Sequence, residues 1–122
     1  MTALGAVITA GDGGVRAYDG ATGSPIGEAA PPSSWIRLTL HPSGIDLYGA
    51  PYNINERAIY RFQLDPVTNA VTSYWEFRPQ ISYPMGGAAF VTPEGTRLIT
   101  REGGLFTSSP VEAEDLLYLR TL

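Results

Sequence analysis

The chain has 122 residues, of which 43% are hydrophobic and 11% aromatic, and this composition excludes a disordered protein and is enough for one packed domain. Its eight basic residues are all arginine and its twelve acidic residues give a net charge of −4, which argues against nonspecific binding to nucleic acid or to an anionic membrane. The absence of cysteine excludes disulfides and thiolate metal sites, and no apolar run approaches the roughly 18 residues of a membrane span.

The N-terminal residues 1–8 form too short an apolar stretch for a signal peptide and lack its basic leader, which predicts a cytoplasmic protein by default. From there on, the chain alternates apolar and polar side chains between turn residues, and it has no convincing helical stripe. The expected strands, in chain order, are residues 7–10, 15–18, 24–29, 35–40, 46–50, 58–64, 71–77, 88–91, 97–101 and 105–108.

Three local patterns recur along the chain. Residues 40–48, with Pro42 and Gly44, return as residues 91–99 after about 51 residues. The Asp-x-x-Thr-Gly segment 19–23 returns as Asp-x-x-Thr-Asn at 65–69 after about 46 residues, and residues 8–15 return as 99–105 after about 90, close to two such periods. One period of 40–50 residues predicts repeated units of four short strands.

The repeated residues are suited to tight turns. In Pro-x-Gly the proline fixes one backbone angle and the glycine supplies a positive φ. In Asp-x-x-Thr-Gly the Asp and Thr side chains bond to nearby amides. Both motifs therefore predict antiparallel hairpins.

The stretch from Gly14 through Asp19, Thr22 and Gly23, followed by Leu38-Thr39-Leu40-His41-Pro42-Ser43-Gly44, resembles the YVTN or lactonase-like β-propeller repeat. The resemblance extends over nearly the whole chain and implies an all-β fold of propeller blades, each a four-stranded antiparallel sheet. These motifs specify a fold much better than a function.

On this pattern, residues 1–122 form a single partial propeller. Its blades are expected at about residues 5–30, 34–78 and 85–110, with a C-terminal closing strand at 116–122. The first blade lacks its innermost strand, residues 51–57 are an insertion in the second, and an acidic stretch at 111–115 replaces the Asp-x-x-Thr-Gly hairpin in the third.

The closing strand has two interpretations. It is either the outer strand of the third blade or, as we slightly favour, the innermost strand missing from the first blade of a neighbouring copy. Fewer than four blades do not close a ring. We therefore expect a homo-oligomer, with a dimer favoured, or a partner chain that supplies further blades. A further possibility is that the chain is a split or truncated propeller whose missing blades are encoded nearby.

Few residues are suited to catalysis or metal binding. His41, the single histidine, is interpreted as a turn residue that bonds backbone, in preference to a catalytic base, and with no second histidine a His-based triad within one chain is excluded. Asp19 and Asp65 are explained by their hairpins. The acidic cluster Glu112, Glu114 and Asp115 is more typical of a solvated loop than of a calcium site. We therefore expect no catalytic residue, no metal and no cofactor.

The insertion supplies the candidate binding residues, because loops held by rigid sheets often bind ligands. With aromatic and Arg side chains of the types enriched at interfaces, the expected set is Tyr52, Asn53, Asn55, Arg57, Trp75 and Arg78. The competing interpretation is that Trp35, Trp75 and Phe77 fill the space between sheets.

These observations favour a non-enzymatic structural or binding module that binds a ligand or a protein. The alternative, implied by the resemblance, is a lactonase-like hydrolase or part of one. Its central site, lined by carboxylates, would form between chains, and Asn53, Asn55 and Glu56 would supply part of it.

Overall fold

The computed structural model describes residues 5–11, 14–29, 36–51, 57–78, 83–85 and 87–122. These residues form strands joined by turns, with one 3₁₀ turn at Glu112–Glu114 (η1). The strands are β1 Ala6–Gly11, β2 Gly14–Asp19, β3 Pro25–Ala29, β4 Ile36–Leu40, β5 Asp46–Pro51, β6 Ile59–Leu64, β7 Val71–Phe77, β8 Ala89–Val91, β9 Arg97–Thr100, β10 Gly104–Thr107 and β11 Tyr118–Thr121. In this part of the chain no helix has the length and apolarity needed to cross a membrane.

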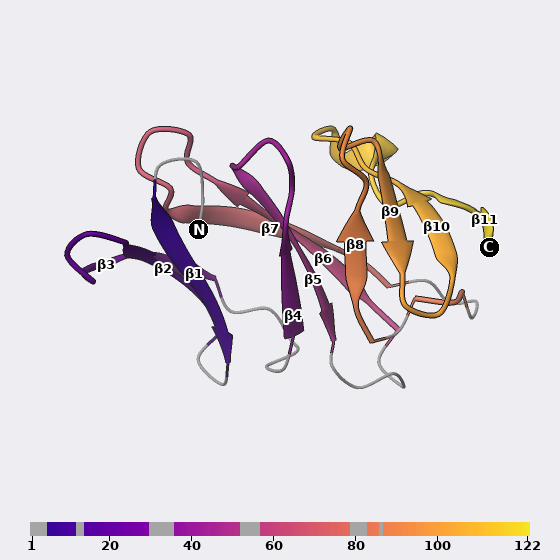
Figure 1. The fold of residues 1–122 in the computed structure, drawn as a ribbon, viewed down its shortest axis with the longest axis horizontal. Coiled ribbons are helices and arrows are strands. Elements are labelled where there is room, and N and C mark those ends of the chain that lie inside the picture. The colour runs from indigo at the N-terminus through magenta and orange to yellow at the C-terminus, as the bar shows by residue number, and fades with distance from the viewer. Residues whose placement is uncertain (1–4, 12–13, 30–35, 52–56, 79–82, 86) are drawn as a thin grey trace.

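The strands make three antiparallel sheets that follow one another along the chain (Figure 1). The first sheet has the order β1-β2-β3, the second β4-β5-β6-β7 and the third β8-β9-β10-β11. The prediction of an all-β protein made of antiparallel sheets is therefore confirmed, and the ends of the first ten strands differ from the expected ends by at most one residue. None of the sheets closes on itself within the described residues.

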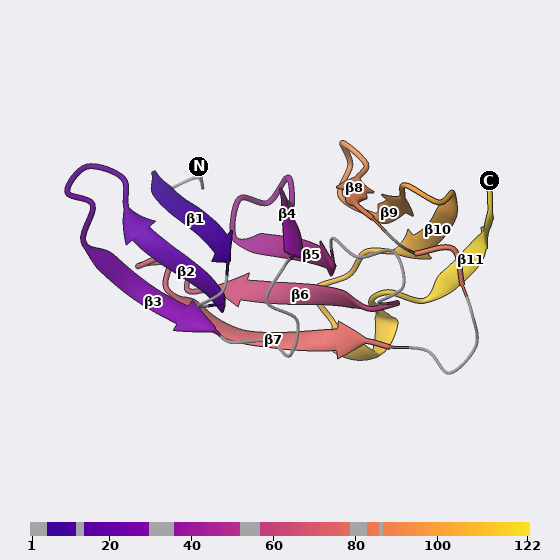
Figure 2. The ribbon, with the colours of Figure 1, turned by 90° about the horizontal axis from the view of Figure 1, so that it is seen from below.

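The sheets stand face to face in a row. Figure 2 shows β1, β4 and β8 along one side of this row, whereas β3 and β7 lie on the opposite side. The most extensive contacts between neighbouring sheets join strands on the same side of the row, namely β3 with β7, β4 with β8 and β1 with β4. Each sheet therefore meets the next in the same orientation.

A first apolar core lies between the first and second sheets. On β2, Val15 and Ala17 are fully buried, and they pack with Tyr60 and Phe62 of β6. Ile8 of β1 is half-buried against the same cluster. These residues alternate along their strands with side chains that point to the opposite face, as the period of two requires.

A second apolar core lies between the second and third sheets. It contains Ile59 of β6 and Leu98 of β9, both fully buried. Around Phe106 the rings of Phe77, Tyr83 and Tyr118 gather with centroid separations between 4.3 and 6.4 Å. Phe77 and Trp75 both pack against this core, so the interpretation that they fill the space between sheets is confirmed. Trp35 lies outside the described residues.

The two Asp hairpins have the geometry expected from their sequences. Asp19 Oδ1 accepts the amides of Ala21 and Thr22, and the hairpin ends at Gly23 with φ of 73°. Asp65 repeats this arrangement with the amides of residues 67 and 68, and Asn69 takes the left-handed position with φ of 61°. The two copies of the motif are therefore the same turn.

The C-terminal strand departs from the favoured expectation. In the chain, β11 pairs with β10 and completes the third sheet as its outer strand, so it is not free to serve as the innermost strand of a neighbouring copy. Leu116, buried and with φ of 57°, turns the chain back toward β10. Tyr118 then stacks on Tyr83 with 4.3 Å between the ring centroids, which holds the strand in place.

Candidate functional site

The predicted binding residues that the structure describes turn to different partners. Tyr52, Asn53 and Asn55 lie outside the described residues. Arg57 precedes β6 and Arg78 follows β7, so both arginines lie at the same end of the second sheet. Their side chains nevertheless serve opposite faces of that sheet.

Arg57 turns toward the third sheet. Its Nη1 donates to the Tyr83 carbonyl at 2.6 Å and lies 3.4 Å from the Glu102 carboxylate. Arg78 turns toward the first core, where its Nη2 donates to the Tyr60 hydroxyl at 3.0 Å. Both side chains thus bond internal groups.

Trp75 belongs to a buried polar cluster. Its indole Nε1 donates to Asp115 Oδ2 at 3.0 Å, and the Arg61 guanidinium lies 5.7 Å from the centroid of its ring. Trp75 therefore helps to join β7 of the second sheet to the loop that follows β10 in the third.

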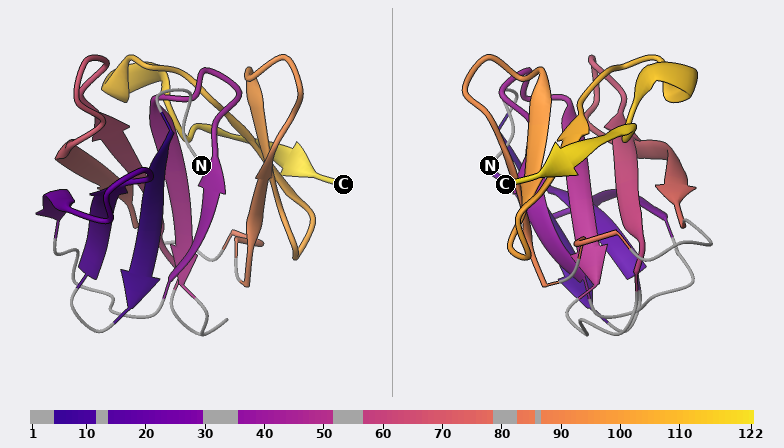
Figure 3. Two further views of the ribbon diagram at one scale, coloured as in Figure 1. Left: turned by 60° about the vertical axis from the view of Figure 1, so that its left-hand side comes forward. Right: turned by 90° about the vertical axis from the view of Figure 1, so that its right-hand side faces the viewer.

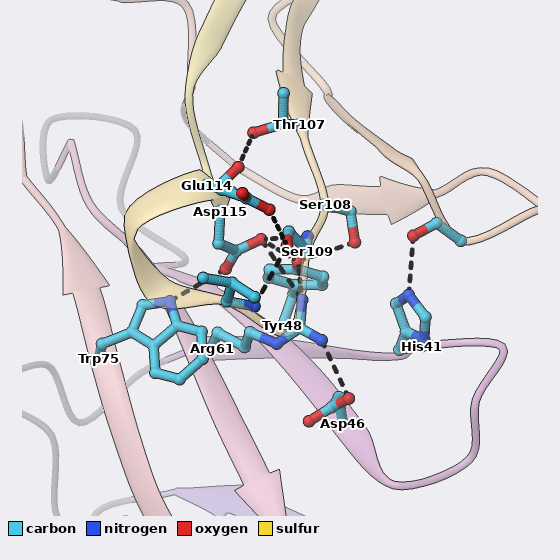
Figure 4. A network of polar contacts seen from close by, with 12 residues as sticks. His41, Asp46, Tyr48, Arg61, Trp75, Thr107, Ser108, Ser109, Glu114 and Asp115 are labelled. Carbon is cyan, nitrogen blue, oxygen red and sulfur yellow. Dashed lines mark hydrogen bonds and ion pairs between the residues drawn. The ribbon is translucent and has the colours of Figure 1, made fainter.

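Arg61 is the centre of this cluster, which we call the Arg61 network and define as Arg61, Asp46, Tyr48, Trp75 and Asp115 (Figure 4). The guanidinium contacts Asp46 at 2.9 Å and Asp115 at 3.3 Å, and it also donates to the Tyr48 hydroxyl. The side chains of Arg61 and Asp115 are 1% and 0% exposed, so solvent does not screen this ion pair.

The Tyr48 hydroxyl of the network keeps its proton. Tyr48 donates to Asp115 Oδ1 at 2.6 Å. Burial raises the pKa of Tyr48 far above its usual value, and the bond to Asp115 raises it further, so the phenol stays protonated. Tyr48 therefore provides no phenolate near neutral pH, and the network is a buried contact between sheets.

His41 acts as a turn residue, as predicted. The Ser43 amide donates to His41 Nδ1 at 3.0 Å, so the ring proton lies on Nε2, which bonds the Gly95 carbonyl at 2.9 Å. Both ring nitrogens are thus occupied. The bond to Gly95 joins two equivalent Pro-x-Gly turns of neighbouring sheets.

The acidic segment after β10 does not form a cation site. Glu112 and Glu114 are exposed in the 3₁₀ turn, whereas Asp115 is buried in the Arg61 network. Across the described ranges, no three His, Asp or Glu side chains lie close enough together to hold a metal ion.

The hairpin carboxylates Asp19 and Asp65 allow a pH prediction. The amides of Thr22 and Thr68 are the leading causes that hold the pKa of these carboxyls below the ordinary 3.8. Because folding lowers the pKa of each carboxyl, the ionised side chain stabilises the fold fully at a pH above its pKa in the unfolded chain. This stabilisation is lost as the pH falls through the pKa in the folded chain. We expect Asp65→Ala to lower the urea midpoint at pH 6, and the difference from the unmodified chain to shrink below pH of about 4. Glu112→Ala, which removes an exposed carboxylate, should give a small difference without this pH dependence.

The row of sheets ends in two uncovered faces. The free face of the third sheet consists of Phe90, Ile99, Leu105, Arg97 and Arg120, which alternate with the residues of the second core. Phe90 is 59% exposed although it lies in a strand between two apolar neighbours. In the right-hand view of Figure 3 the third sheet lies in front, and none of the described elements covers it.

The free face of the first sheet consists of Val7, Thr9, Arg16, Tyr18 and Glu28, which the strand register places on one side. Val7 is 41% exposed, and Arg16 pairs with Glu28 at 3.3 Å. A shallow hollow of about 500 Å³ lies over its outer half, between Tyr18 and Glu28. Another hollow, of about 650 Å³, lies between the two Asp hairpins and is lined by Asp19 and Thr68.

Comparison of the chain with protein-family models, with curated proteins and with solved structures found no match. The Arg61 network and the two free faces were not identified from the sequence. The available signals were an arginine inside the apolar strand 59–64 and apolar residues at both phases of strands 88–91 and 105–108.

Proposed function

We propose that the chain is a run of β-propeller blades that works as a non-enzymatic structural or binding module, and that a second copy closes its ring. On this proposal the three sheets are consecutive blades. The recurrence of the same turns at one period supports the assignment, as does the contact of each sheet with the next through strands on the same side of the row.

One observation carries the proposal. The side of each sheet that turns toward the next sheet is buried in the first and second sheets, as at Val15 and Ile59, whereas the corresponding side of the third sheet leaves Phe90 59% exposed. A propeller ring covers every such face with another blade. Two copies would together supply about six blades, within the usual range of four to eight.

The test is the mass of the chain in solution. Size-exclusion chromatography with light scattering at micromolar concentration should give the mass of two copies. A well-behaved monomer at that concentration would contradict closure by a second copy.

Assays of simple lactones and a metal screen by mass spectrometry separate this module from the hydrolase. A scaffold gives blanks in both. Hydrolysis that survives repurification, together with a stoichiometric metal, would overturn the non-enzymatic assignment.

A further inference from the structure

We infer that two copies associate head to tail, with the free face of the third sheet of one copy packed on the free face of the first sheet of the other. This inference rests on the proposed function and names the surface through which the ring closes. It also makes the contact heterologous, because two different faces meet at each of two equivalent junctions.

The orientation follows from the two junctions inside the chain. The second sheet, which takes part in both junctions, contacts the following sheet with one side and the preceding sheet with its opposite side. Ile59 of β6 points to the third sheet, while Tyr60 and Phe62 point back to the first. Repeating this step once more places the free face of the third sheet against the side of a first sheet that bears Val7 and Tyr18.

The apolar residues of the two faces are suited to burial. Ile99 pairs with Phe90 on one side and with Leu105 on the other, which makes a continuous apolar row across three strands. On the first sheet, Val7 and Tyr18 are directly opposite each other in the register. Contiguous exposed apolar rows on a soluble chain are typical of interaction surfaces.

The charges of the two faces disfavour the contact of two like faces. Arg97 and Arg120 on the third sheet give its free face a positive charge, and both are exposed. On the free face of the first sheet Arg16 and Glu28 pair with each other at 3.3 Å, so their charges cancel. Contact of a third sheet with a first sheet therefore avoids the repulsion between two third sheets, in which arginines would face arginines.

The pairing of β11 with β10 argues against the alternative in which copies exchange this strand, because the exchange would break existing contacts. Moving β11 to the edge of a neighbouring β1 would break its hydrogen bonds with β10 and the stacking of Tyr118 on Tyr83. The exchange would replace the pairing of β11 with β10 by a pairing of β11 with β1, so the number of strand pairings would not increase. Association through faces keeps every strand pairing that the chain already makes.

Two variants that each block one face test the inference. Leu105→Arg places a large cation in the apolar row of the third sheet, and Val7→Arg does the same on the first sheet. The matched control is Val67→Arg, at a site that is 81% exposed on the β6–β7 hairpin, away from both faces. Each protein is measured by light scattering alone and in equimolar mixtures, at the concentration where the unmodified chain has the mass of two copies.

We expect each blocking variant alone to have the mass of one chain, and Val67→Arg to keep the mass of two. An equimolar mixture of Leu105→Arg and Val7→Arg should recover the mass of two, because one junction in the mixed pair joins two unmodified faces. If either blocking variant loses its circular dichroism spectrum, Phe90→Arg or Thr9→Arg replaces it on the same face.

The other outcomes are distinct. A dimeric unmodified chain whose mass survives Val7→Arg, or whose blocking variants stay monomeric when mixed, overturns the head-to-tail contact but leaves assembly of copies intact. A monomeric unmodified chain removes the proposed closure itself, before any variant is compared.

Discussion

Replacing Arg61 by methionine is expected to lower the free energy of unfolding by about 3–5 kcal/mol. The Arg61 side chain is 1% exposed and lies between the carboxylates of Asp46 and Asp115, at 2.9 and 3.3 Å. Without the guanidinium, two negative charges remain close together in a site that water does not reach, and the Tyr48 hydroxyl loses a donor. Urea denaturation at pH 7, with the same slope assumed for both proteins, measures the loss.

Two further variants show whether the cause is the uncompensated charge. Arg78→Met removes an arginine from the same sheet whose side chain is 46% exposed, and it should cost less than about 1 kcal/mol. Adding Asp46→Asn and Asp115→Asn to Arg61→Met removes both carboxylate charges that lack the Arg61 guanidinium, and it should restore part of the stability. A loss for Arg61→Met as small as that for Arg78→Met would mean that the network is hydrated or absent.

The strands were predictable because their signals are local. Alternating side chains and turn residues such as Asp65 and Asn69 lie within a few positions of each other, and the hairpins that they form are made of bonds between neighbours. The repeat strengthens the prediction of these hairpins, because the same turn motif recurs at the next period.

The Arg61 network was not predictable, because its partners are distant in sequence. Arg61 and Asp115 are separated by 54 positions, and nothing near Asp115 distinguishes it from the exposed Glu112 and Glu114. In addition, the alternation of strand 59–64 predicts one polar side facing solvent. The second sheet is covered on both sides, so both sides of this strand are buried, and the polar position holds an ion pair instead of water.

The binding residues were predicted from side-chain type, which does not separate residues that bind a partner from residues that make contacts within the chain. Arg57, Trp75 and Arg78 have the chemistry of interface residues, but the same properties suit contacts between sheets.

The C-terminal strand shows a related limit of prediction from sequence. The sequence of residues 116–122 does not reveal which sheet edge lies within reach, and here a buried Leu116 at positive φ directs the chain to β10.

Gly104→Ala is the other substitution with a large expected effect, a loss of about 3 kcal/mol in the free energy of unfolding. A Cβ on Gly104 would lie 2.2 Å from the Pro84 carbonyl oxygen and 2.7 Å from the Phe106 ring. The carbonyl belongs to backbone that Thr100 holds by a hydrogen bond, so relief requires moving β10 away from the segment at Pro84. Because Phe106 and Met85 both belong to the second core, that movement also loosens the contact between the second and third sheets.

Gly23→Ala separates packing from backbone conformation. Gly23 has φ of 73° and open space around its Cβ position. Alanine there should lower the free energy of unfolding only by the cost of the left-handed backbone conformation, about 1–2 kcal/mol. Gly104 has no such backbone requirement, whereas the neighbouring Gly103 has φ of 90°. If urea denaturation shows Gly104→Ala to be no more destabilising than Gly23→Ala, β10 does not approach Pro84 as closely as described. A larger loss at Gly104 means that a small residue is needed here because two segments of backbone touch.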